Sequence, residues 1–317
     1  MSFHCTFADL FLRPAWRATA GACLVSAVLV SLPAWAQTPS RSAGGSGLSA
    51  DFSYARSSGN AGYTANAVTA NVEFAALPLA LGLDGVQSLT DGQETSTQVG
   101  ASAKWRMSDW MSVTAKLATA NDDLVNVNTR GIAFAWNLHR LWQGKRSTRL
   151  ELGHDISDYS LHSGASALSA RIPQQRRTSI ELLQGVTPDF DLYGSAEWYT
   201  YSRDPQDLAR ALISRKVRRF TLASKLGNLT DWGLTLGAGW SLGSDWNLDL
   251  AVGRSSSVIG QNQNQWNGTL SYAFHPRASV SVGYAASRVE ALTSEQGQTL
   301  SPQQDDSTVE IGLRWLY

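Results

Sequence analysis

The amino-acid sequence predicts an all-β fold, a transmembrane antiparallel up-and-down β-barrel of about 14 strands. Three observations lead to this prediction. Apolar and polar residues alternate with a period of two through most of the chain, as in strands with one apolar face. After residue 36, no apolar run reaches the roughly 20 residues of a membrane-spanning helix. Short polar connections also alternate with long ones along the chain, as in membrane barrels.

The first 36 residues have the form of a secretory signal peptide. Arg13 and Arg17 precede an apolar run, and Ala34-Trp35-Ala36 has the small-x-small form of a cleavage site. A lipid anchor on Cys23 is disfavoured, because the apolar run follows this cysteine instead of preceding it. The expected organisation is a signal peptide over 1–36, a flexible lead over 37–46 and a barrel over 47–317.

Charge and cysteine content exclude several classes of function. The chain has 26 basic and 26 acidic side chains; Arg13, Arg17 and Asp9 fall in the signal peptide, so 24 and 25 remain. This balance gives no reason to expect a nucleic-acid partner. Cys5 and Cys23 are the two cysteines, and cleavage removes both, together with any disulfide or thiolate metal site. We expect no cofactor and no metal.

The alternation predicts strands along the whole chain. The apolar face of successive strands is formed by Phe52 and Tyr54; Val68, Val72 and Phe74; Leu79, Leu81 and Leu83; Val99 and Trp105; Met111, Val113 and Leu117; Ile132, Phe134, Trp136 and Leu138; Leu150 and Leu152; Ile180 and Leu182; Phe190, Leu192 and Trp198; Trp246, Leu248, Leu250 and Val252; Trp266, Leu270, Tyr272 and Phe274; Val280, Val282 and Tyr284; and Val309, Ile311, Leu313, Trp315 and Tyr317.

The region between residues 190 and 242 is open to more than one count. Its segments 190–203, 216–227 and 231–242 suggest three strands, whereas the topology needs an even number of crossings between two short turns on the same side. We therefore expect one long strand over 216–242, interrupted near 228–231, and 14 strands in total. A mature chain of 281 residues suits about 12 to 16 strands.

The connections predict the orientation of the barrel. Short turns typically lie on the periplasmic side and longer loops outside. The short turns are expected at 77–78, 108–109, 143–146, 187–189, 243–245 and 275–277, and the longer loops at 57–64, 90–96, 121–129, 160–176, 203–217, 258–265 and 290–306.

The stretch 306–317 carries a family resemblance. It alternates apolar and polar residues and ends on Tyr317. This resembles the last strand of Gram-negative outer-membrane β-barrels, which typically closes on an aromatic residue. The resemblance implies location in the cell outer membrane and, as partners, outer-membrane lipid, lipopolysaccharide and the barrel assembly machinery. Chain length and strand count are similar to those of OmpG-type monomeric porins.

The alternation also predicts which side chains face the lumen and which meet the membrane interface. Basic residues on the fourth and fifth strands and acidic residues on the seventh to ninth could form two charged walls, or they could pair locally. The predicted pore-lining residues are Lys104, Arg106, Lys116, Arg149, Glu151, Glu181, Asp191, Tyr193, Glu197 and Tyr199. The predicted membrane girdle is Trp105, Trp110, Trp246, Trp266, Trp315 and Tyr317.

Three functions compete for such a barrel. We expect a passive, porin-like pore for small polar solutes; the alternatives are a partner-dependent barrel for exopolysaccharide export or structure, and an outer-membrane lipid hydrolase. The segment 154–164 holds His, Asp and Ser residues, but successive strand residues point to opposite faces, so a catalytic triad is not expected there. The amide-rich segment 261–268 is expected to be a polar loop, and 204–219 a basic segment of helical composition.

Overall fold

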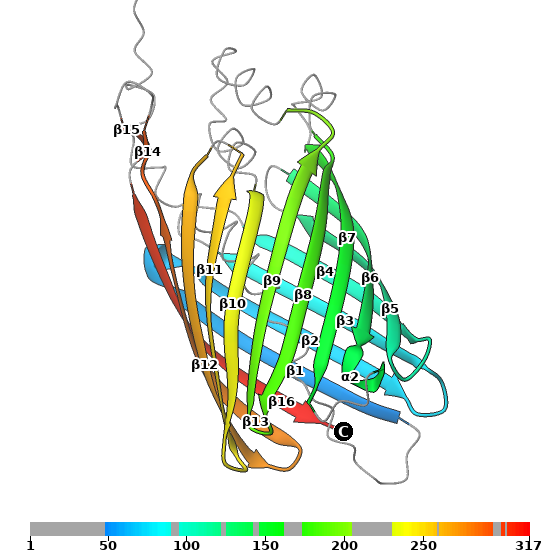
Figure 1. Ribbon diagram of the computed structural model, residues 1–317. Helices are drawn as coiled ribbons and strands as arrows, with labels where there is room; N and C mark the ends of the chain where they lie inside the picture. Colours follow the sequence, from blue (N-terminus) through cyan, green and yellow to red (C-terminus); the bar gives the residue numbers. More distant parts are fainter. Residues whose placement is uncertain are drawn as a thin grey trace, which may run out of the picture.

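The structure is a computed structural model, and it describes residues 48–89, 95–121, 125–141, 146–161, 173–204, 230–258, 260–293, 299–301 and 303–317. Fourteen antiparallel strands form one closed barrel, in the order of the chain, and β1 pairs with β16 to close the ring (Figure 1). This confirms the predicted fold class and strand number. The barrel strands are β1 Leu48–Gly59, β2 Thr64–Phe74, β3 Leu79–Leu89, β4 Ser96–Arg106, β5 Met111–Asn121, β6 Val125–Asn137, β7 Thr148–Leu161, β8 Gln175–Thr187, β9 Phe190–Tyr201, β10 Thr230–Leu242, β11 Trp246–Ser257, β12 Asn262–His275, β13 Ala278–Val289 and β16 Gln304–Leu316.

Small elements complete the described structure. The 3-10 helix η3 (Asn60–Gly62) joins β1 to β2, and the four-residue helix α2 (Leu138–Leu141) follows β6. A separate two-stranded sheet pairs β14 (Leu292–Thr293) with β15 (Thr299–Ser301). None of the helices in the described residues is long and apolar enough to span a lipid bilayer.

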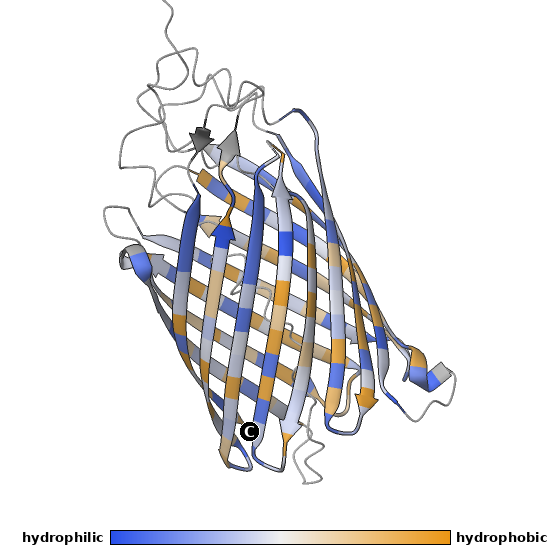
Figure 2. Cartoon of the chain, turned by 60° about the vertical axis from the view of Figure 1, so that its left-hand side comes forward, coloured by the Kyte–Doolittle hydropathy of each residue, from blue (hydrophilic) through white to orange (hydrophobic). Residues whose placement is uncertain are grey.

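The outer face of the barrel is apolar. Within each strand the exposed large hydrophobic side chains fall on one face, and Leu83 and Leu117 are 61% and 65% exposed. Blue and orange residues alternate along the strands, and blue gathers towards their upper ends (Figure 2). A continuous apolar outer wall is stable when it contacts lipid, so the strands cross a membrane.

The seam between β1 and β16 is held by backbone and side-chain contacts. The backbone of Ala50 and Tyr317 exchanges two hydrogen bonds of 2.8 and 3.1 Å. The Arg314 guanidinium donates to both carboxylate oxygens of Asp51 at 2.8 and 3.0 Å, on the inner side of the seam. At the other end Asn60 accepts a 3.0 Å hydrogen bond from the Ser307 backbone N–H.

The two rims of the barrel differ. The short-turn rim carries the connections after β2, β4, β6, β8, β10 and β12, and the opposite long-loop rim carries those after β1, β3, β5, β7, β9, β11 and β13 (Figure 1). Four aromatic pairs lie at the short-turn rim: Phe134 with Trp136, Phe190 with Trp240, Trp246 with Tyr272, and His275 with Trp315. Aromatic side chains of this kind are favoured at the level of lipid headgroups.

Several strands run further towards the long-loop rim than the sequence indicated. The amide-rich segment 261–268, expected to be a loop, lies mostly in β12, which begins at Asn262. β6 begins at Val125 and β1 continues to Gly59, both inside expected loops. Near this rim both faces of a strand meet water, so the alternation disappears although the backbone ladder continues.

The chain after β6 differs from the expectation. Leu138 and His139 were expected to extend β6, but they lie in α2, where a short helical turn leads the chain away from the sheet. Several expected segments lie outside the described residues. These are the signal peptide, the flexible lead, most of the basic segment 204–219, and the part of the interruption near 228–231 up to residue 229. The described remainder of the expected long strand is β10.

Candidate functional site

The candidate functional site is the inner wall of the barrel, formed by the side chains that alternate with the exposed apolar ones. All ten residues predicted to line the pore fall on this face by their strand register. They come from five strands: Lys104 and Arg106 from β4, Lys116 from β5, Arg149 and Glu151 from β7, Glu181 from β8, and Asp191, Tyr193, Glu197 and Tyr199 from β9.

Ion pairs between near neighbours tie many of these groups to the wall. Arg149 Nη2 lies 2.6 Å from Glu151 Oε2, two residues along the same strand. Arg106 Nη2 lies 3.3 Å from Glu73 Oε1. Each pair orders a guanidinium against a carboxylate along the wall, as in the local-pairing alternative.

Arg177 on β8 forms the most extended of these arrangements, and it was not among the predicted pore-lining residues. Its Nε donates to Glu197 Oε2 at 2.7 Å, and its Nη1 lies 3.4 Å from Asp155 Oδ2. It therefore links β7, β8 and β9. Arg177 is an even number of residues from Glu181, so the alternation places both on the inward face. Residues 160–176 were expected to be a loop, however, and this loop ended just before Arg177.

The sheet order decides how the two groups of charges lie. Only β6 separates β5 from β7, so the acidic residues of β7 and β8 follow the basic residues of β4 and β5 around the same part of the ring. The acidic residues of β9 lie five strands from β4, more than a third of the ring away. Lys104, Lys116 and the ion pairs of Arg106 and Arg149 thus share one part of the inner wall.

Inward-facing glycines let neighbouring side chains lie flat. A Cβ at Gly237 would collide with the ring of Tyr193, one at Gly131 with the carboxylate of Asp155, and one at Gly233 with Glu197. Because long side chains extend across these glycines along the wall, they fill less of the lumen than they would if they pointed to its axis.

The inward tyrosines also bind to the wall. Tyr193 is buried and donates a 2.8 Å hydrogen bond to Asp249 across β10. Tyr201 donates to the Thr230 carbonyl oxygen at 2.6 Å and accepts a 2.9 Å bond from Gln175. Tyr199 lies beside Arg177 in the ladder.

A second inner surface, which we call the acidic row, lies on the other side of the ring. It is a single line of ladder partners that crosses β9 to β16: Asp191, Gly239, Asp249, Thr269, Gly283 and Glu310. The residues between the carboxylates are small. Ser57 donates a 3.0 Å hydrogen bond to Glu310, and Asp191 is half-buried. Only Asp191 was in the predicted site; the inward parity of Asp249 and Glu310 was visible in the alternation, but their alignment depends on register.

The predicted girdle residues within the strands, together with Tyr317, fall on the outward face, and Trp110 lies in the bend before β5. Their exposed fractions run from 37% for Trp110 to 70% for Tyr317. Most lie at the short-turn rim, whereas Trp266 lies in the middle of β12. Their contact with the membrane interface stays a prediction.

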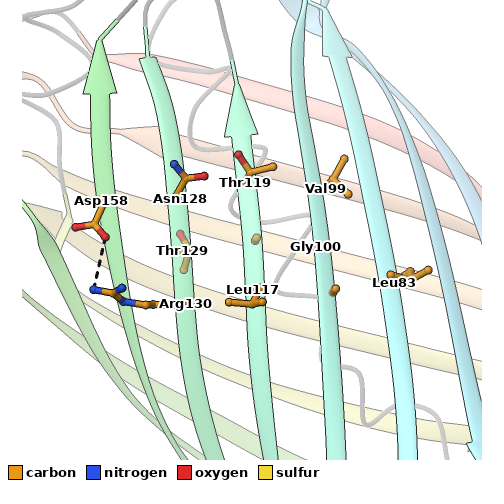
Figure 3. Close-up of a pocket in the computed structure, with 11 residues that line it drawn as sticks. Leu83, Val99, Gly100, Leu117, Thr119, Asn128, Thr129, Arg130 and Asp158 are labelled. Atoms are coloured by element: carbon orange, nitrogen blue, oxygen red, sulfur yellow. Dashed lines mark ion pairs between the residues drawn. The ribbon is translucent and has the colours of Figure 1, made fainter.

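A groove of about 430 Å³ lies on the outer wall across β3 to β7 (Figure 3). Leu83, Val99 and Leu117 form its apolar part, and Arg130 lies 3.8 Å from Asp158 at its polar end. Arg130 and Asp158 share the face of the exposed apolar residues, so the groove opens on the lipid side and is no part of the lumen.

The His, Asp and Ser residues of 154–164 diverge wherever the structure describes them. The ring of His154 faces outward beside Thr178 Oγ1, at 3.2 Å, while Asp155 faces inward to Arg177. Ser160 points outward to the Asn126 carbonyl oxygen. These groups do not converge, and among the described residues no group of three or more His, Cys, Asp and Glu side chains is arranged to hold a metal ion.

Comparisons with known proteins give likeness in fold. No family profile matches the chain, and no curated protein matches it in sequence. Among solved structures, the chain is similar to a KdgM porin (9% identity, TM-score 0.40, 84% of this chain and 98% of that one covered). It is also similar to the CymD monoaromatic hydrocarbon channel (11%, 0.48, 85% and 88%) and to an anion-selective porin from Comamonas acidovorans (10%, 0.42, 85% and 98%).

Proposed function

We propose that the protein is a passive outer-membrane pore for small polar solutes. The observation that carries this proposal is the inner wall: a closed ring of 14 strands lined by charged and hydroxyl-bearing side chains that bind to one another along the wall. Eight-stranded barrels are filled by their side chains, whereas barrels of about 16 strands hold an aqueous channel. Fourteen strands with flattened side chains favour a water-filled path.

The distribution of outward-facing arginines supports location in the outer membrane. Arg56, Arg130, Arg176, Arg254 and Arg288 all lie in the half of their strands that leads to the long-loop rim. Lipopolysaccharide carries phosphate groups, which guanidinium groups bind well. We propose that the long-loop rim faces outward and that these arginines contact lipopolysaccharide.

Planar-bilayer recording tests the pore. Protein extracted from outer membranes, or refolded and shown by heat-modifiable electrophoretic mobility to be a barrel, is added to one side of the bilayer. Stable unitary current steps that grow linearly with voltage support the proposal. A correctly folded barrel that gives no current steps at any voltage contradicts it, and export or enzymatic activity would then be tested.

A further inference from the structure

The inner and outer faces of the barrel carry different net charge, although the whole chain is neutral. Within the described barrel strands, and apart from Asp231 at the irregularity that begins β10, the inward face carries eleven carboxylates and six basic groups. The inward carboxylates are Asp51, Glu73, Asp84, Glu151, Asp155, Glu181, Asp191, Glu197, Asp249, Asp306 and Glu310. The inward basic groups are Lys104, Arg106, Lys116, Arg149, Arg177 and Arg314. The outward face of the same strands carries five arginines and two aspartates, Asp158 and Asp305.

Four of the six inward basic groups are already paired. Arg106, Arg149, Arg177 and Arg314 form ion pairs with five carboxylates of the wall. The remaining charges on the inward face are two lysines and six carboxylates. An ion in the lumen therefore meets a wall with a net negative charge.

The acidic row concentrates this charge on one side. The described residues of β9 to β13 place no lysine or arginine on the inward face, whereas Lys104, Arg106 and Lys116 lie on the side formed by β4 and β5. Two carboxylates of the row accept hydrogen bonds from hydroxyl groups: Asp249 accepts from Tyr193 and Glu310 accepts from Ser57. Hydroxyl donors stabilise a carboxylate without cancelling its charge.

We infer that the pore selects cations over anions, and that the acidic row contributes to this selectivity. The inference rests on the proposed pore function. Fixed charge on a narrow low-dielectric wall raises the local concentration of ions of opposite sign. The preferred solutes are small cations and neutral polar molecules, whereas polyanions such as acidic oligosaccharides are disfavoured. The effect comes from the potential of the wall and needs no bound ion.

The reversal potential in a KCl gradient tests the inference. We expect a K⁺/Cl⁻ permeability ratio of about 3 at pH 7. The double variant Asp191→Asn/Asp249→Asn keeps side-chain shape and an acceptor for Tyr193, and it should lower the ratio by about 1.5- to 2-fold. The matched control, Asp158→Asn/Asp305→Asn, removes the same number of charges from the outward face and should leave the ratio unchanged.

The other outcomes separate a failure of the selectivity inference from a failure of the proposed pore. Conducting pores with a ratio at or below 1, or an inner double variant that conducts with the ratio of the parent, overturn the inference but leave the pore intact. A folded barrel without conductance contradicts the pore itself. If the inner variant does not fold, the parent protein is recorded from pH 7 down to pH 3, because protonation removes the negative charge of a carboxyl group. A ratio that stays constant over this range overturns the inference.

Discussion

Two regions of the inner wall stabilise their carboxylates with different side chains. From β4 to β9, arginines pair with carboxylates, and Arg177 alone contacts Asp155 and Glu197. In the acidic row, which begins at Asp191 on β9 and ends at Glu310 on β16, glycine, threonine and hydroxyl donors surround carboxylates that lack a cationic neighbour in the row. The first side is held together by charge pairs, and the second leaves its charge available to the lumen. A barrel can thus divide stability and selectivity between two parts of one sheet.

Added bulk on the inner wall should cost most where a side chain lies over a glycine. Gly237→Val would push Tyr193 from its place over the glycine and break its 2.8 Å hydrogen bond to Asp249. We expect a loss of about 2 kcal/mol in the free energy of unfolding. Urea unfolding in lipid vesicles, followed by tryptophan fluorescence, measures it.

Gly239→Val is the matched control on the same strand and face. A Cβ there has only the Asp249 carboxylate within 4 Å, at 3.8 Å, so the variant should be close to the parent in stability. Equal losses for the two variants would show that bulk anywhere on β10 is unfavourable and that Tyr193 plays no special part.

The charge-paired side should lose stability when its central cation is removed. Arg177→Gln leaves Asp155 and Glu197 close together without a counter-charge, and the guanidinium is 36% exposed, so water screens part of the effect. We expect a loss of about 1 kcal/mol. The same urea titration measures it. A variant as stable as the parent protein would contradict this account.

Removal of the basic groups near β4 and β5 should sharpen the contrast between the two sides. Lys104→Gln/Arg106→Gln/Lys116→Gln removes three positive charges from the inner wall, and we expect the K⁺/Cl⁻ permeability ratio to rise by about twofold with assembly preserved. The reversal potential in a KCl gradient measures it. An unchanged potential would exclude these residues from the narrow part of the pore.

The smallest effect is expected on the outward face. Arg288 Nε lies 2.7 Å from Asp305 Oδ1, as close as Arg177 Nε is to Glu197, but its side chain is 53% exposed. Arg288→Gln should leave the midpoint of the same urea titration unchanged. A loss as large as that of Arg177→Gln would mean that distance, and not the surroundings, decides the strength of these pairs.

The sequence predicted the barrel because lipid contact imposes a period of two on every strand. It predicted the inward face of Lys104 or Glu197 for the same reason. It could not predict strand ends such as that at Asn262, because the period disappears where both faces are wet. Nor could it align Asp191 with Asp249. The alternation shows which face of the sheet a residue is on, whereas its neighbours on the next strands depend on the register and on connections of unequal length.

The seam between β1 and β16 has a consequence for how the chain folds. Asp51 and Arg314 are 263 positions apart in sequence, whereas most neighbouring strands are also neighbours along the chain. Contacts between residues so far apart in sequence form late, because a long loop must close first and its closure costs conformational entropy. Hairpins should therefore add to a growing open sheet with two unpaired edges, and the ring should close in one final cooperative step whose rate limits the appearance of the native barrel.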